Sequence, residues 1–365
     1  MSTIQSFPYT IGYNDNKVLN IYIEKYKQIL HHLAQKHLDK DIAATPDILQ
    51  FLSIGDIASN LLLLGKPEPG NGAEYAKKFL EKEWAEFKIG GLQNLSSVKG
   101  SKIPGTNILL TNNDYTPGGV ARINHPSQKD GAQLTGFSSI EEKEWLNLYA
   151  QVFEKIREIH PGFYTELTSV LQKVVPIGIS RDCHNSGSFS DCIGHIYMSY
   201  PIGNIEPVIA VLEAVIHEYN HNKLHIIMMS DPLILNSGEE IYYSPYRPDA
   251  RHLYGIYAGL HALSAVLYVI FTGIQEGTLT SPSKDLILKS LLYFMKDEAS
   301  VRVLEKYGKF SPLGQELLNE MKAVHKHTLG IIKELRYGHE LLEAASRECR
   351  NHFLEAQKNN KKILY

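Results

Sequence analysis

The segment AVIHEYNHNKLH contains two histidines, His217 and His221, separated by four positions, and Glu218 follows the first of them. Residues four apart on a helix lie one above the other on one face, so both imidazoles would reach a single metal ion. The surrounding apolar stretch predicts a helix from about Pro207 to about Met229. Imidazoles and a carboxylate on a buried helix need polar partners, and a metal supplies one. The pattern therefore predicts a metal site.

Chance is the alternative, because this chain has 16 histidines and the motif fixes only three positions. His225 continues the same helix face one turn beyond His221. We expect it beside the site or at the surface, because the helix would have to bend to make it a third ligand.

The third ligand decides the chemistry, and two residues are candidates. Glu240 follows His221 at a spacing used by zinc peptidases, in which zinc would polarise a water and Glu218 would act as general base. Its neighbours Gly238 and Glu239 indicate a turn, so a solvated glutamate is the alternative. His261 lies within an apolar stretch, where its alternative is a histidine satisfied in the core.

Arg247 and Arg251 are four residues apart in the segment YRPDAR. Three facial ligands with open positions are typical of non-haem Fe(II) oxygenases, which need a cation to hold the distal carboxylate of an oxo acid. A guanidinium fork binds a carboxylate through two hydrogen bonds. The alternative is that these arginines pair with Glu239, Glu240 or Asp249.

Three segments together resemble a known family: SGSFSDCIGHIYMSYP, EAVIHEYNHNKLHIIMMSDPLI and YYSPYRPDARHLYGIYAGLHAL. They are similar to the HExxH-motif proteins of peptide natural-product clusters. The characterised members are iron- and α-ketoglutarate-dependent peptide β-hydroxylases. The resemblance implies that His217 and His221 bind Fe(II), and Arg247 and Arg251 are the candidates for α-ketoglutarate.

The chain departs from the family pattern at one position. The family has a histidine where Ala258 aligns, and His261, one turn later on the same face, would replace it as the third ligand. On this interpretation Glu218 orients a ligand histidine or a bound water rather than acting as a base.

These observations predict a dioxygenase that uses Fe(II) and α-ketoglutarate to hydroxylate the β-carbon of a side chain in a ribosomal peptide. The first alternative is a zinc metallopeptidase with His217, His221 and Glu240 as ligands and Glu218 as base. The second is a catalytically inactive relative that binds a peptide.

Composition and charge narrow the remaining possibilities. A net charge of −3 gives no basic field for nucleic acid. The sparse cysteines (Cys183, Cys192 and Cys349) and the lack of a signal-like N-terminus predict a cytoplasmic protein. Cys183-His184 and Cys192-x-x-His195 do not have the spacing of common zinc sites.

The chain is expected to be mainly α-helical with a few short strands, forming one catalytic domain over 1–365 with a candidate N-terminal helical subdomain at 1–90. Residues 90–137, rich in Gly, Ser, Asn and Pro, predict a loop and a candidate lid. Residues 253–271 contain no charged side chain, but they include a histidine and several tyrosines, which favours a buried core helix over a membrane span. The other expected elements are helices at 18–37, 45–64, 73–89, 139–160, 282–307 and 311–358, and the strands VVPIGIS and GHIYMSY.

Overall fold

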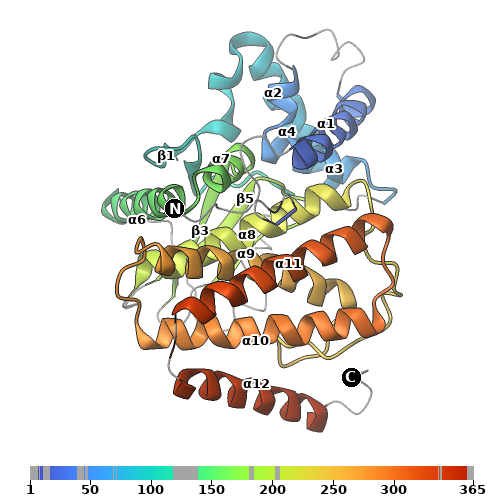
Figure 1. Cartoon of the computed structure of the whole chain (residues 1–365). Helices are drawn as coiled ribbons and strands as arrows, with labels where there is room; N and C mark the ends of the chain where they lie inside the picture. The colour runs from blue at the N-terminus through green and yellow to red at the C-terminus, as the bar shows by residue number, and fades with distance from the viewer. Residues whose placement is uncertain are drawn as a thin grey trace. The chain divides into compact units, whose positions relative to one another are not determined.

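The computed structural model confirms a mainly α-helical chain with a small sheet (Figure 1). It describes residues 7, 9–10, 17–38, 45, 48–68, 70, 72–117, 139–180, 185–201, 206–335, 337 and 339–359. The expectations placed on Pro46, Cys183 and His184, and on most of the candidate lid, lie outside these residues.

The α-helices are α1 (Lys17–His37), α2 (Ile48–Leu52), α3 (Gly55–Leu64), α4 (Gly72–Gly90), α6 (Ser139–Ile159), α7 (Pro161–Val170), α8 (Pro207–Met228), α9 (Leu253–Gln275), α10 (Lys284–Tyr307), α11 (Pro312–Leu335) and α12 (His339–Asn359). The strands are β1 (Ser101–Lys102), β2 (Leu109–Leu110), β3 (Lys173–Ser180), β4 (Ser186–Gly187) and β5 (His195–Pro201), and two short 3-10 helices, η2 (Leu92–Asn94) and η3 (Ser96–Val98), precede β1.

The chain divides into two compact units, each assembled from separate segments. The sheet unit comprises residues 16–155 and 164–226, and the helical unit comprises residues 1–15, 156–163 and 227–365. Neither unit has a boundary at residue 90. The expectation of one catalytic domain over 1–365 remains a prediction.

The sheet unit is built on five strands in the order β1-β2-β3-β5-β4. Strands β2, β3 and β5 run parallel to one another, whereas the edge strands β1 and β4 pair antiparallel with β2 and β5. Val174, Ile196 and Met198 are fully buried. Such near-continuous apolar runs are typical of parallel strands covered on both faces. The pairing of β3 with β5 is irregular between Pro176 and Ile179, where proline lacks the N–H that a regular ladder needs.

A single asparagine ties helix α8 to strand β5. The Asn222 Oδ1 accepts the Gly194 N–H at 2.7 Å, and its Nδ2 donates to the His195 carbonyl oxygen at 3.2 Å. Asn222 is fully buried, so these bonds replace the water it lost. They fix the position of α8 along the strand, and with it the position of the histidine motif.

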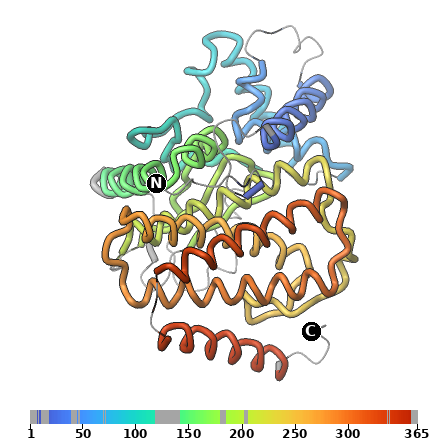
Figure 2. Tube along the Cα trace, in the orientation of Figure 1, coloured from blue at the N-terminus to red at the C-terminus, as the bar shows by residue number. Residues whose placement is uncertain are grey.

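The helical unit is centred on α9. This helix is long and apolar enough to cross a membrane by length and composition, and 83% of its most apolar window is buried within the structure. Helices α10 and α11 pack against it, and α12 packs on α10 (Figures 1 and 2). The apolar stretch is therefore a core helix, as predicted from its histidine and tyrosines.

Two of the expected helices are interrupted. The stretch 311–358 forms α11 and α12, and the stretch 45–64 contains α2 and α3 with a break at Ser53 and Ile54. A distant side chain stabilises this second break. The Gln172 Oε1 accepts a hydrogen bond from the Gly55 N–H at 2.8 Å, and the Gln172 Nε2 donates one to the Ser53 carbonyl oxygen at 2.6 Å. Gln172 thus satisfies an orphan donor at the start of α3.

Candidate metal centre and a buried polar network

The two motif histidines converge on one point of α8, as predicted. The Nε2 atoms of His217 and His221 are 3.0 Å apart, and the ring planes are nearly perpendicular. Two nitrogens at about 2.1 Å from one ion, at right angles to each other, would also be about 3.0 Å apart. Both side chains are half-buried. The pair therefore fits two adjacent ligands of one metal ion.

Glu218 is held by two serine hydroxyls from the segment that begins with β4. Its Oε1 accepts from the Ser186 Oγ at 2.7 Å, and its Oε2 accepts from the Ser188 Oγ at 2.6 Å. The carboxylate is only 4% exposed. Both oxygens thus have a donor, and the side chain is fixed against the edge of the sheet. This arrangement suits a positioning role.

A buried ion pair fixes the rotation of α8. The Lys223 Nζ is 2.8 Å from Glu166 Oε1, and both side chains are buried. The Tyr219 hydroxyl donates to the same oxygen. These contacts hold two residues of α8 in the interior, and the histidine face remains half-exposed. A half-exposed face can be reached by a ligand.

His225 lies beside the pair on the same face. Its ring is nearly parallel to that of His221, with centroids 6.4 Å apart. Burial lowers the pKa of His225 to about 4, against a smaller opposing effect of Asp191. The imidazole is therefore neutral at pH 7 and places no positive charge next to His221.

The third-ligand candidates both belong to the helical unit. His261 is fully buried, and its Nε2 is 2.7 Å from the Tyr9 carbonyl oxygen. A carbonyl can only accept, so the proton lies on Nε2 and the lone pair on Nδ1. This is the environment of a core histidine, and ligation by this tautomer would use Nδ1. The assignment of His261 as third ligand remains a prediction.

Glu240 has the exposed position expected for the alternative interpretation. It follows a turn at Gly238 and Glu239, and the Tyr242 hydroxyl donates to its Oε2. This hydrogen bond lowers the pKa of Glu240, and Asn236 contributes in the same direction. The carboxylate is therefore ionised at neutral pH with a donor already in place.

The two arginines proposed to hold α-ketoglutarate do not lie on a helix. Residues 245–249 form turns and bends, and both arginine side chains are exposed. The Arg251 Nε pairs with Asp249 Oδ2 at 2.7 Å, as the alternative interpretation expected. Exposed ion pairs are weak and exchange easily. Within the described part of the chain Arg247 forms no ion pair, so its fork is the more accessible one.

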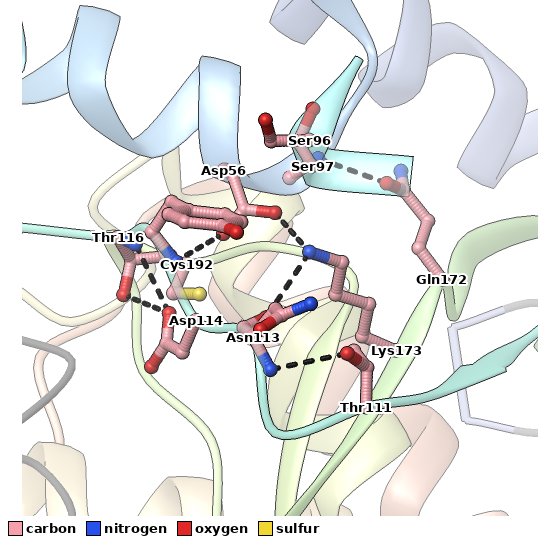
Figure 3. A network of polar contacts seen from close by, with 12 residues as sticks. Asp56, Ser96, Ser97, Thr111, Asn113, Asp114, Thr116, Gln172, Lys173 and Cys192 are labelled. Carbon is pink, nitrogen blue, oxygen red and sulfur yellow. Dashed lines mark hydrogen bonds and ion pairs between the residues drawn. The ribbon is translucent and has the colours of Figure 1, made fainter. Parts of the chain in front are cut away.

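The sheet unit also contains a buried polar network that the sequence analysis missed (Figure 3). Lys173, at the start of β3, forms an ion pair with Asp56 of α3, and both side chains are buried. The Tyr115 N–H donates to the other Asp56 oxygen at 2.9 Å. Asp114 accepts from the Thr116 hydroxyl at 2.6 Å and from the Tyr197 hydroxyl at 2.9 Å.

Ligand atoms of Asp56, Asp114 and His195 all lie within 4.8 Å of one another, which is close enough for a shared cation. However, the Lys173 ammonium already neutralises Asp56 from within the fold. A second cation would have to compete with it. The sequence did carry a signal: Asp56 and Lys173 are charges within apolar segments, and buried charges are almost always paired.

The described cysteines, Cys192 and Cys349, form no disulfide with each other. The Cys192 Sγ is buried and lies 3.5 Å from the Tyr197 hydroxyl. This contact places Cys192 beside the polar network as a weak hydrogen-bonding partner.

Comparison of the chain with protein-family models found no match, and comparison with curated proteins found none either.

Proposed function

We propose that this protein is an Fe(II)- and α-ketoglutarate-dependent oxygenase that hydroxylates the β-carbon of a side chain in a ribosomal peptide. The observation that carries the proposal is the convergence of the His217 and His221 Nε2 atoms, 3.0 Å apart on a half-exposed helix face. The similarity of residues 186 to about 270 to HExxH-motif peptide hydroxylases supports the choice of iron over zinc.

The residues of α8 would each have a defined part. His217 and His221 would hold the iron, which with α-ketoglutarate and oxygen supplies the oxidising power that breaks an unactivated C–H bond. Glu218, fixed by its two serine donors, would orient a ligand histidine or a bound water. The apolar body of α8 would limit access of bulk water to the reacting atoms.

The zinc metallopeptidase is the competing proposal, and it gives Glu218 a different role. A general base must receive a proton from a metal-bound water. In this structure each Glu218 oxygen accepts one hydrogen bond from a serine hydroxyl. A carboxylate oxygen has a second lone pair, so a metal-bound water can donate to Glu218 without displacing a serine. The contacts of Glu218 therefore fit both roles, and the choice of iron rests on the resemblance of residues 186 to about 270.

Anaerobic reconstitution tests the proposal before any substrate is known. The protein is titrated with Fe(II) and then with α-ketoglutarate, and the visible absorption band of the chelated oxo acid is recorded. We expect a band that is lost in His217→Ala. His339→Ala removes an exposed helical histidine and should leave the band unchanged.

Three results would contradict the proposal. A protein that retains zinc through purification and gives no band would favour the peptidase. A protein that binds neither metal would be the inactive peptide-binding relative. Iron binding without a band, in both the parent protein and Arg247→Ala, would argue against α-ketoglutarate as the second ligand.

A further inference from the structure

A pocket of about 490 Å³ lies in the helical unit between α10 and α12. Its apolar lining includes Met295, Val303 and Phe353, and Tyr243 also lines it. Tyr243 is held there, because its ring packs edge-on against Phe353 and its hydroxyl is 3.0 Å from His352 Nδ1. The volume is within the range of about 300–1,000 Å³ that small-molecule sites occupy.

The charged residues around this pocket are mostly cations. Arg302, Lys306 and Arg350 line it, with Glu298 as the one carboxylate among the lining residues. Arg302 pairs with Glu298 at 2.8 Å, and this pair is exposed. Within the described chain Arg350 forms no ion pair. An apolar interior with an excess of positive charge at its edge is complementary to an amphipathic anion.

We propose that this pocket binds a small amphipathic anion, a molecule with an apolar body and one carboxylate or phosphate head group. The body would pack on Met295, Val303 and Phe353, and the head group would lie against the Arg350 guanidinium. The inference is independent of the proposed metal chemistry, because it uses none of the residues of α8.

Cys349 provides a reporter inside the pocket. Its side chain is one of the lining residues and is half-buried. Burial raises the pKa of the Cys349 thiol, so it is neutral at pH 7 and reacts slowly rather than as an activated nucleophile. A ligand in the pocket should slow its alkylation further by blocking access.

The experiment measures the alkylation rate of Cys349 in the full-length protein with N-ethylmaleimide, followed by peptide mass spectrometry. Decanoate and decyl phosphate are the anionic probes, and decanol is the uncharged probe of the same chain length, all below micellar concentration. We expect an anionic probe to protect Cys349 at about tenfold lower concentration than decanol, the loss expected when a charge-assisted contact is missing. The more protective anion identifies the head group.

Variants separate charge recognition from simple filling of an apolar space. Arg350→Ala should abolish the advantage of the anionic probes, whereas Arg347→Ala, an exposed arginine on α12 outside the pocket, should keep it. Equal protection by decanol and the anions would overturn the proposal, as would an unchanged advantage in both Arg350→Ala and Arg302→Ala. Absence of protection by all three probes would also overturn it. Circular dichroism of each variant confirms that the helices are intact.

Discussion

Two polar clusters of the sheet unit differ in how their members are paired. Around Asp56 and Lys173, hydrogen-bond donors surround a buried pair of opposite charges. On α8, by contrast, the Nε2 atoms of His217 and His221 face each other on a half-exposed surface. A cluster whose charges and donors satisfy one another serves the stability of the fold. The two imidazole nitrogens on an accessible face have the separation of adjacent metal ligands, which supports the proposed metal site.

The largest effect should come from the histidine pair of α8. His217→Ala removes one of two converging ligands, and we expect metal binding at micromolar concentration to be lost, measured by isothermal titration with Fe(II) under argon. Loss of groups that merely support metal ligands already costs about 10–100-fold in affinity. The free energy of unfolding without metal should change little, because His217 is half-exposed. An unfolded variant would show that this histidine belongs to the core instead.

The next largest effect should come from the cluster around Asp56 and Lys173. Lys173→Ala leaves Asp56 buried without its counter-ion, and we expect a loss of about 3–5 kcal/mol in urea unfolding. Lys78→Ala breaks an exposed pair with Glu74 and is the matched control, with an expected loss below about 0.5 kcal/mol. Equal losses in the two variants would mean that the buried charge of Asp56 does not depend on Lys173.

Adding Asp56→Asn to Lys173→Ala should recover part of the stability, because the uncompensated charge is removed. A double variant as unstable as the sum of the two single variants would show that Asp56 and Lys173 are not coupled.

A third effect concerns pH, and it arises outside both clusters at His160 in the helical unit. Its Nδ1 accepts the Phe163 N–H at 3.0 Å, which requires the neutral ring, and burial lowers its pKa to about 4. The unfolded chain takes up a proton near pH 6.5, so the stabilisation is complete above that value and is lost as the pH falls towards 4. Between pH 7 and pH 5 we expect a loss of about 2 kcal/mol.

His160→Asn keeps a hydrogen-bond acceptor at this helix start but does not titrate. Urea unfolding at pH 7 and pH 5 should therefore show a smaller loss for this variant than for the parent protein. An identical pH dependence in the two proteins would exclude His160 as its source.

The smallest effect sharpens the role of Glu218. Ser188→Ala removes a hydroxyl that donates to Glu218 Oε2 and should cost about 1 kcal/mol in urea unfolding. The exposed Ser190 is the matched control, and Ser190→Ala should change almost nothing. If Glu218 positions the metal site, Fe(II) affinity should also fall in Ser188→Ala; an unchanged affinity would confine the contact to stability.

Local patterns predicted much of the architecture. Helix α8 begins at Pro207 as expected and ends at Met228, and the two longest strands coincide with the apolar runs VVPIGIS and GHIYMSY. The convergence of His217 and His221 also follows from spacing alone, because helical geometry fixes it. Where the prediction failed, as between α2 and α3, the determinant was the distant side chain of Gln172.

The contacts between Asp56 and Lys173 could not be predicted for the same reason. Asp56 and Lys173 are separated by 117 positions in the sequence, and no local pattern specifies which buried charges meet. The serine partners of Glu218 lie about 30 positions away, Ser186 on the short edge strand β4 and Ser188 just after it. The third metal ligand depends on long-range placement in the same way, so sequence could only offer His261 and Glu240 as candidates.

The contact of Gln172 with the start of α3 bears on the order in which the chain folds. The bonds to Gly55 and to Ser53 close loops of more than a hundred residues. Forming these bonds requires a large loss of chain entropy before any favourable contact is made, and this loss slows folding. Helices α9, α10 and α11 follow one another closely along the chain and need no such closure. We therefore expect the helical segments after Leu253 to gain hydrogen-exchange protection before the junction of α2 and α3 in refolding experiments.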